Sequence, residues 1–240
     1  MAAVLSEEAD TPIPLRDGAP VVVAIDPIDG SGSIGIGAPL GSLFAVFPAC
    51  QNEPFLRPGR EAIAAGYLSF GHSLDLGFTL GRGTTKATFD PASGSFHLEE
   101  EAVRLAPQAK MIASNRRHWP EGLQTYHDDI LAGRDGPRGR DVNMRWLAAA
   151  VGELHRILRR GGAFLYPADS RAGSEHGKLR LSYEAVPIAL LVEQAGGAAT
   201  DGVRAILDIA SASHHQHTPL VFGVVSRFWW KFSGGILRAG

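Results

Sequence analysis

Two aspartates, Asp26 and Asp29, close an apolar run at residues 21–25, and a glycine- and serine-rich stretch, residues 30–33, follows them directly. An isolated acid at the end of a strand is usually a solvated turn residue. Here Pro27 restricts the backbone, so both carboxylates can face one point. Mg²⁺ and Mn²⁺ prefer such oxygen ligands, and the N–H groups and hydroxyls of residues 30–33 can hold phosphate oxygens. The pattern predicts a divalent-metal site beside a phosphate.

Acidic residues also follow two other predicted strands. Glu7 and Glu8 come after a short apolar stretch near the N-terminus, and Glu184 comes after the stretch at residues 179–183. Acids at the ends of several strands can converge on one edge of a sheet. We therefore expect these residues to join Asp26 and Asp29 around the metal.

Other polar residues have an ordinary interpretation beside a functional one. Lys178 and Arg180 alternate along a predicted strand and would form either a solvated face or part of an anion site. Arg145 begins a predicted helix, where positive charge is unfavourable, which hints at another role. Tyr166 ends a strand, a position typical of a core rim, and His155 is interpreted as structural. The remaining histidines considered lack the paired spacing that a zinc site needs: His72, His97, His214, His215 and His217.

The elements that must position these residues change along the chain. The first half is strand-rich, and Asp90-Pro91 leading to Gly94 is typical of a hairpin turn. The predicted strands are residues 21–25, 42–48, 64–70, 74–80, 84–89 and 95–98. The second half has apolar residues at helical spacing in residues 119–132, 145–160 and 183–195. Short strands are predicted at residues 163–166, 179–183 and 206–209. This order indicates a mixed, layered α/β fold.

Composition bounds the class of protein. The 240 residues are 45% hydrophobic, and the net charge of −2 requires no basic face, so nucleic acid is not the default partner. No apolar run is long enough to span a membrane, and the N-terminus lacks the features of a signal peptide. The single Cys50 fits a reducing compartment. We expect a cytoplasmic protein without a membrane segment.

Residues 26–31 resemble the metal-binding signature of the lithium-sensitive phosphatase superfamily. Residues 161–171, 177–187 and 191–202 are similar to the class I fructose-1,6-bisphosphatases, and residues 114–119 and 133–146 resemble the bacterial, Calvin-cycle type of that family. The resemblance runs from Glu7 to Phe222. Family members carry a long segment before Ser6-Glu7-Glu8, so the layered α/β/α/β sugar phosphatase fold is expected to lack its N-terminal helices and strands here. Residues 1–132 would carry the metal and phosphate loop, and residues 133–240 would bind the sugar phosphate.

The resemblance implies roles for individual residues. Glu7, Asp26, Asp29 and Glu184 would hold metal through carboxylates and Ile28 through its carbonyl oxygen, with Glu8 and Asp29 catalytic. Glu8 would help to order the attacking water. The cleaved phosphate would be held by Asp29, Gly30, Ser31 and Gly32, and the sugar and its other phosphate by Asn115, Tyr166 and Lys178. Arg145 would reach the 6-phosphate in a neighbouring subunit.

The implied reaction is metal-dependent hydrolysis of the 1-phosphate of fructose 1,6-bisphosphate, in the Calvin cycle or gluconeogenesis. The implied cofactor is Mg²⁺, with Mn²⁺ as the alternative, and the implied assembly is a homotetramer. Sedoheptulose 1,7-bisphosphate is the alternative substrate. An inactive sugar-phosphate-binding fragment or regulatory subunit is the alternative of a different class. The chain departs from the family at residues 32–35, where an asparagine is lost, and at Trp146, where a phosphate-contacting tyrosine is common.

Overall fold

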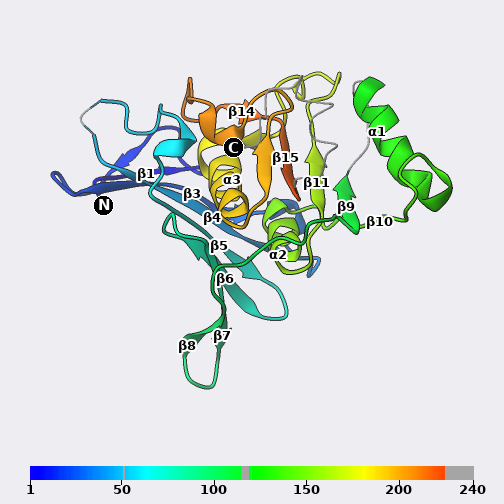
Figure 1. The fold of residues 1–240 in the computed structure, drawn as a ribbon. Coiled ribbons are helices and arrows are strands. Elements are labelled where there is room, and N and C mark those ends of the chain that lie inside the picture. The colour runs from blue at the N-terminus through cyan, green and yellow to red at the C-terminus, as the bar shows by residue number, and fades with distance from the viewer. Residues whose placement is uncertain (51, 115–118, 120, 225–240) are drawn as a thin grey trace.

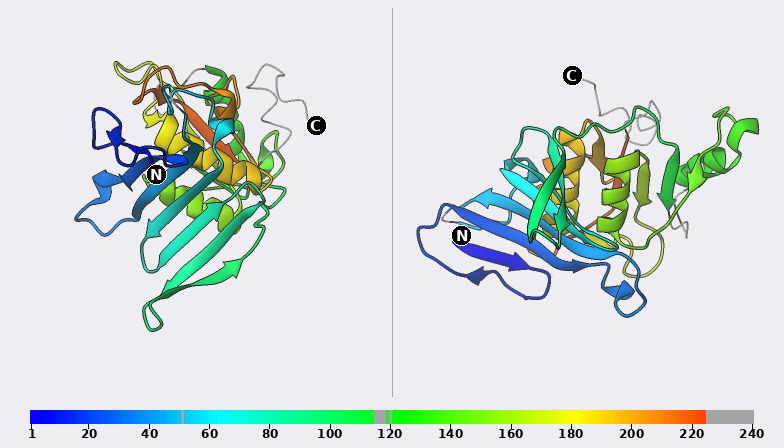
Figure 2. Two further views of the ribbon diagram at one scale, coloured as in Figure 1. Left: turned by 90° about the vertical axis from the view of Figure 1, so that its left-hand side faces the viewer. Right: turned by 90° about the horizontal axis from the view of Figure 1, so that it is seen from below.

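The computed structural model describes residues 1–50, 52–114, 119 and 121–224. The chain forms a large sheet, a pair of helices, a second sheet and an outer helix, stacked in that order (Figures 1 and 2). The paired helices are α2 (Ala150–Arg160) and α3 (Val186–Gln194), and the outer helix is α1 (Glu121–Leu131). Among the described residues, no helix is both long and apolar enough to cross a membrane. The layered α/β arrangement confirms the predicted fold class.

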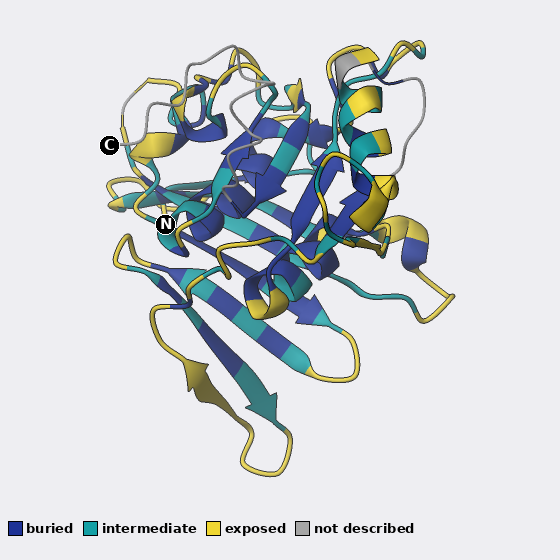
Figure 3. Ribbon diagram, turned by 45° about the vertical axis from the view of Figure 1, so that its right-hand side comes forward, coloured by how far each residue is buried: buried dark blue, intermediate teal, exposed yellow. Residues whose placement is uncertain are grey.

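The large sheet has eight strands in the order β2-β1-β3-β4-β5-β6-β7-β8. Strand β1 is parallel to β3, and every other neighbouring pair is antiparallel. Buried and half-buried residues alternate along β3 and β4, as expected for strands with one face on a core. Strand β8 is exposed along its whole length (Figure 3). The bounds are β1 Ala3–Ser6, β2 Ile13–Pro14, β3 Val21–Asp29, β4 Leu40–Pro48, β5 Ala64–Phe70, β6 Leu74–Thr79, β7 Thr84–Asp90 and β8 Ser95–Glu100.

The second sheet has five strands in the order β10-β9-β11-β15-β13. Strand β11 is parallel to β9 and antiparallel to β15. A separate two-stranded antiparallel sheet pairs β12 with β14. The bounds are β9 Met111–Ser114, β10 Asn143–Met144, β11 Ala163–Tyr166, β12 Leu179–Arg180, β13 Ala198–Thr200, β14 His217–Thr218 and β15 Leu220–Gly223.

Helix α3 lies in the middle of the molecule, between the two sheets (Figure 1). Its residues from Val186 to Val192 are all buried, which fits a helix that is apolar on every side. Helix α2 buries Leu154 and Ile157 in the same core. The outer helix α1 closes a smaller apolar cluster that includes Ile112, Ile130 and Leu165.

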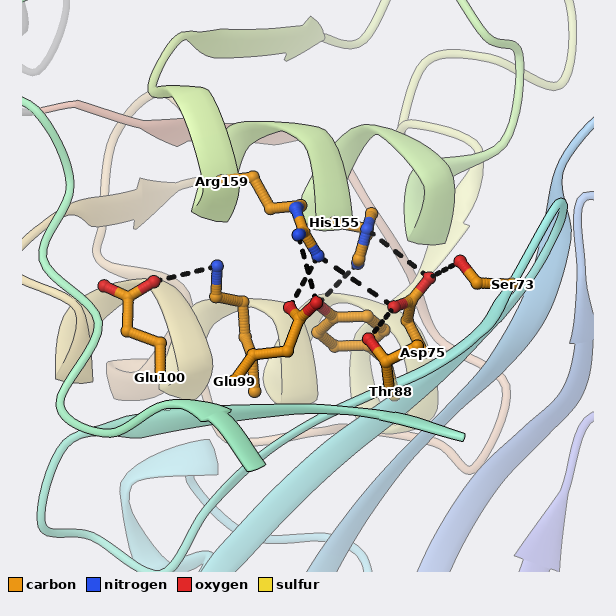
Figure 4. Close-up of polar contacts among 9 residues, drawn as sticks. Ser73, Asp75, Thr88, Glu99, Glu100, His155 and Arg159 are labelled. Carbon is orange, nitrogen blue, oxygen red and sulfur yellow. Dashed lines mark hydrogen bonds and ion pairs between the residues drawn. The ribbon is translucent and has the colours of Figure 1, made fainter. Parts of the chain in front are cut away.

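A polar network fixes α2 to the large sheet (Figure 4). Asp75 on β6 is buried and accepts hydrogen bonds from Ser73 Oγ at 2.5 Å and Thr88 Oγ1 at 2.6 Å. On α2, His155 Nε2 lies 3.7 Å from Asp75, and Arg159 pairs with Glu99 on β8 at 2.7 Å. Burial acts to raise the pKa of Asp75, but these hydrogen bonds and positive charges lower it overall. The carboxylate is therefore paired and helps to orient the helix.

The structure corrects three predicted elements. The strand predicted at residues 179–183 ends at Arg180, and a π-helical turn, Leu181–Ala185, leads directly into α3. Residues 206–209 form a short 3₁₀ helix, Ile206–Asp208, instead of a strand. The helix predicted at residues 145–160 begins only at Ala150. Ala149 is extended and Ala148 has a φ of 62°, so neither can continue a right-handed helix backward.

The conformation of Ala148 gives a stability prediction. A left-handed φ costs an alanine about 1 kcal/mol or more, and glycine avoids that cost. The greater conformational entropy of glycine in the unfolded chain offsets part of this gain in stability. We expect Ala148→Gly to raise the free energy of unfolding by about 0.5 kcal/mol, measured by urea denaturation. The matched control is Ala132→Gly, at an exposed alanine with a φ of −63°, which should lower stability. Equal losses in both variants would contradict the assignment of strain to Ala148.

Candidate metal centre and phosphate loop

A β-bulge places Asp26 and Asp29 on the same side of β3. The pairing with β4 shifts between them: Asp26 pairs with Leu43, but Asp29 pairs with Gly41. Side chains of a regular strand alternate between faces, so two residues separated by three positions would point apart. The extra residue in β3 cancels that alternation, and both carboxylates are buried. Asp26 Oδ1 also accepts the N–H of Ile28 at 2.8 Å, which holds the bend.

Glu184 meets the two aspartates of β3 from a different element of the chain. It lies on the π-helical turn before α3, and carboxylate oxygens of Asp26, Asp29 and Glu184 all lie within 4.8 Å of one another. The backbone N–H of Arg180 donates to Glu184 Oε2 at 2.5 Å and orients the side chain. The predicted convergence of acids on one point is therefore confirmed for these three residues.

The electrostatics of this cluster fit a bound cation. Burial is the largest cause that raises the pKa of all three acids, to about 8 for Asp26, to about 6 for Asp29 and well above its usual value for Glu184. Each acid also feels the negative charge of its neighbours. No Lys, Arg or His of the described residues forms an ion pair with them. Buried carboxylates without a cationic partner, all offering oxygen, are the ligands of a hard divalent ion.

Glu7 and Glu8 occupy the turn after β1. Glu7 is half-buried, and its side chain hydrogen-bonds Asp26 and raises the pKa of that residue. Glu7 therefore borders the cluster, as predicted. Glu8 is exposed, and its backbone N–H donates to Ser6 Oγ, so the structure places it beside the centre without bringing it into the convergent group. The roles of Glu8 and of the Ile28 carbonyl stay predictions.

The glycine- and serine-rich loop packs against the start of α2. Asp29 Oδ2 accepts the N–H of Val151 at 2.6 Å, and the N–H of Ala150 also donates to this carboxylate. A helix N-terminus favours a negative charge, so Asp29 caps α2 from a distant strand. Gly30 has a φ of 83°, and a Cβ there would lie 2.6 Å from Cβ of Ala149. The sequence reasoning missed this contact because Ala149 has no capping side chain that would mark the helix start.

The close approach at Gly30 gives a prediction for the loop. Gly30→Ala should displace residues 30–33 from α2 and lower the expected phosphatase activity by about 10²-fold, because a shift near 1 Å costs that much in a positioned site. Gly32→Ala is the matched control, since an added Cβ there meets nothing within 4 Å and φ is not in the left-handed region. Initial rates of phosphate release would compare them. Similar rates in both variants would show that the loop position does not matter.

The residues expected to hold the sugar are placed less completely. Asn115 lies outside the described residues. Tyr166 ends β11, and burial raises its pKa, with a smaller contribution from the charge of Glu184. Trp146 stacks on Phe164 with ring centroids 5.6 Å apart and contacts Tyr166 edge-on. These aromatic rings pack against one another at the end of β11, and the charge of Glu184 reaches Tyr166.

The basic residues expected to hold the second phosphate are Arg145, Lys178 and Arg180. Arg145 is exposed after β10, and Lys178 is exposed with its Nζ donating to the carbonyl of Gly173 at 3.0 Å. Arg180 is half-buried, and its Nε is buried without a hydrogen-bond partner among the described residues. A buried donor of this kind is available to an oxygen of a bound molecule.

Buried carboxylates beside a glycine-rich loop at a helix start define a site for metal-assisted phosphoryl chemistry. Residues 1–101 match the family described as "Fructose-1-6-bisphosphatase, N-terminal domain", and residues 105–228 match the corresponding C-terminal domain. The chain is 56% identical to a fructose-1,6-bisphosphatase class 1 from Brucella anthropi, over 93% of this chain and 66% of that protein. It is 55% identical to the class 1 protein of Brucella canis, over 93% and 67% of the two chains.

A solved structure is also similar. The crystal structure of Leishmania major fructose-1,6-bisphosphatase in holo form matches with a TM-score of 0.85 and 30% identity, over 92% of this chain and 71% of that one. The chain belongs to the fructose-1,6-bisphosphatase family. It spans about two thirds of the length of the curated relatives that it matches.

Proposed function

We propose that the protein hydrolyses the 1-phosphate of fructose 1,6-bisphosphate to fructose 6-phosphate and inorganic phosphate. The observation that carries this proposal is the buried convergence of Asp26, Asp29 and Glu184 beside the loop at residues 30–33. Family membership supports the substrate, because similar proteins from Brucella and Leishmania bear that name. The intact acid set argues against the alternative of an inactive binding protein.

The chain's own residues would hold and orient the substrate. Asp26, Asp29 and Glu184, with Glu7 at the edge, would hold Mg²⁺ or Mn²⁺. Such ions neutralise charge on phosphoryl oxygens and lower the pKa of water. The N–H groups of Gly30 and Ser31 would hold the phosphate that is cleaved, a contribution of about 3 kcal/mol for each donor of this kind.

The remote half of the substrate would be positioned by basic and polar groups. Lys178 and the unpartnered Nε of Arg180 would bind the second phosphate, together with Asn115. Binding energy from this remote phosphate can be used to orient the reacting one. Arg145, exposed at the surface, would serve the site of a neighbouring subunit in a homotetramer. We further propose a cytoplasmic enzyme of the Calvin cycle or gluconeogenesis.

Phosphate release from fructose 1,6-bisphosphate, with Mg²⁺ and with EDTA, tests the proposal directly. We expect release only with the divalent ion. Sedoheptulose 1,7-bisphosphate, assayed in parallel, gives the sugar preference from the ratio of the two kcat/KM values. A folded protein that binds fructose 1,6-bisphosphate but releases no phosphate with Mg²⁺ or Mn²⁺ would favour the inactive binding protein instead.

A further inference from the structure

A cavity of about 540 Å³ lies beside the two-stranded β12–β14 sheet. Three segments line it, at residues 175–176, at residues 201 and 204, and at residues 212, 213 and 215–219. The metal-centre carboxylates do not line it, and neither do Tyr166, Lys178 or Arg145. Its volume is typical of a pocket for a small metabolite. The cavity is therefore a separate candidate site on the same chain.

Basic side chains gather on one face of this two-stranded sheet, and of these His176 and His217 line the cavity, whereas Lys178 and Arg180 lie outside its lining. Arg180 on β12 pairs directly with His217 on β14, and residues opposite each other on neighbouring strands point to the same face. Burial lowers the pKa of His217, and the charges of Arg180, Lys178 and His176 lower it further. In the part of the chain that the structure describes, none of these four side chains forms an ion pair.

The two acids that line the cavity, Asp201 and Glu175, already accept hydrogen bonds from their own loops. Asp201 accepts the N–H groups of Val203 at 2.7 Å and Arg204 at 2.6 Å, and it also pairs with the Arg204 guanidinium at 3.2 Å. The pKa of Glu175 is lowered first by a hydrogen bond from its own backbone, with a smaller contribution from His176. Glu175 is exposed and turned to its own loop. Both carboxylates therefore direct their hydrogen bonds mainly to their own loops.

The groups that face the cavity suit an anion better than a metal ion. His176, His217 and Arg204 offer N–H donors, and Gln216 offers its NH₂ group because its oxygen already accepts the N–H of Ala212 at 2.6 Å. His215 is held by Tyr183 at 2.8 Å. Among the described residues, the side chains that converge closely enough to hold a metal are Asp26, Asp29 and Glu184, and no histidine. Arginine donors of this kind bind phosphate groups strongly, and a neutral imidazole still donates one N–H.

We propose that this cavity binds a small phosphorylated metabolite, with its phosphate between His176 and His217 and its remainder against Gln216 and Arg204. The site would act without the metal and apart from the sugar-bisphosphate site, so it does not depend on the proposed hydrolysis. Residues 175–178 connect the cavity to the proposed sugar-bisphosphate site, because His176 lines the cavity and Lys178 is expected to hold the substrate.

The test uses glycerol 3-phosphate as the probe and glycerol as its uncharged control, in EDTA. NMR of histidine side chains locates the binding: the imidazole signals of His176 and His217 should shift and saturate with the phosphate and not with glycerol. Titration calorimetry gives the affinity. The double variant His176→Gln with His217→Gln should weaken binding about tenfold, which corresponds to about 1.4 kcal/mol.

His72→Gln is the matched control, because it makes the same change at an exposed histidine in the β5–β6 turn. It should leave the affinity unchanged. The proposal is overturned if the two imidazole signals do not saturate, if glycerol shifts them equally, or if the double variant binds as well as His72→Gln. The last result would assign the anion to the sugar-bisphosphate site instead. Because no turnover is measured, a failure here leaves the proposed phosphatase activity standing.

Discussion

Replacing Asp29 with asparagine is expected to lower kcat/KM for Mg²⁺-dependent phosphate release by about 10³-fold or more. The carboxylate of Asp29 converges with those of Asp26 and Glu184, and a neutral amide cannot replace a charged ligand of a divalent ion. The amide oxygen can still accept the Val151 N–H, which Asp29 now accepts at 2.6 Å, so the start of α2 should survive. Initial rates over a range of substrate concentrations, with circular dichroism to confirm the fold, make the measurement.

Asp17→Asn is the control for this experiment. Asp17 is an exposed acid in the loop between β2 and β3, and its replacement removes the same charge without touching the centre. It should keep full activity. If Asp29→Asn retained more than about a tenth of the rate, less than 1.4 kcal/mol of transition-state stabilisation would depend on Asp29. The three-carboxylate centre would then not be the site of the reaction.

Replacing Asp26 with asparagine is expected to stabilise the metal-free protein above pH 8, by roughly 2–5 kcal/mol. The pKa of Asp26 is raised to about 8, first by burial and then by the charges of Glu7 and Asp29. Because the folded-state pKa lies above the unfolded one, folding favours the protonated acid. That stability is present at low pH and is lost as the pH rises through about 8. Asparagine, which never ionises, avoids the loss.

Urea denaturation in EDTA at pH 5 and pH 9 measures this effect. The wild type should lose stability between the two values, and Asp26→Asn should lose less, although Asp29 and Glu184 still titrate. Saturating Mg²⁺ should reverse the order, because an ion that binds only the folded wild type adds about 2.7 kcal/mol at 100 times its Kd. Equal pH dependence in the two metal-free proteins would contradict the raised pKa of Asp26.

The strands of the first half could be predicted because their signal is local. The strand predicted at residues 64–70 has the same bounds as β5, although Gly66 interrupts the alternation of buried and half-buried residues along it. The turn from Asp90 to Gly94 also closes as predicted, with the Gly94 N–H donating to the Asp90 carbonyl at 2.9 Å. Strands β13 and β15 are too short for an alternation of apolar and polar residues to be recognised in the sequence. The division of the chain after residue 132 stays a prediction.

The acids of the candidate site could be predicted from the sequence, but the elements and contacts that hold them in place could not. Asp26, Asp29 and Glu184 stand out by type and position, but only tertiary contact shows that Glu184 lies on a π-helical turn and not after a strand. The predicted helix start at Arg145 was wrong because Ala148 and Ala149 carry no local signal of a break, although their backbone conformation makes one. The contact between Asp29 and Val151 joins residues far apart in sequence, and no pattern along the chain encodes it.

Because of the bulge in β3, the number of residues between Asp26 and Asp29 decides whether their side chains share one face of the sheet. Ile28, the extra residue's neighbour, has 36% of its surface exposed, so many side chains could stand there at little cost. Removing the position altogether is different, because the strand would regain its even alternation and carry Asp29 to the opposite face of the sheet. This stretch should therefore tolerate substitution at Ile28 while rejecting a change of one residue in length.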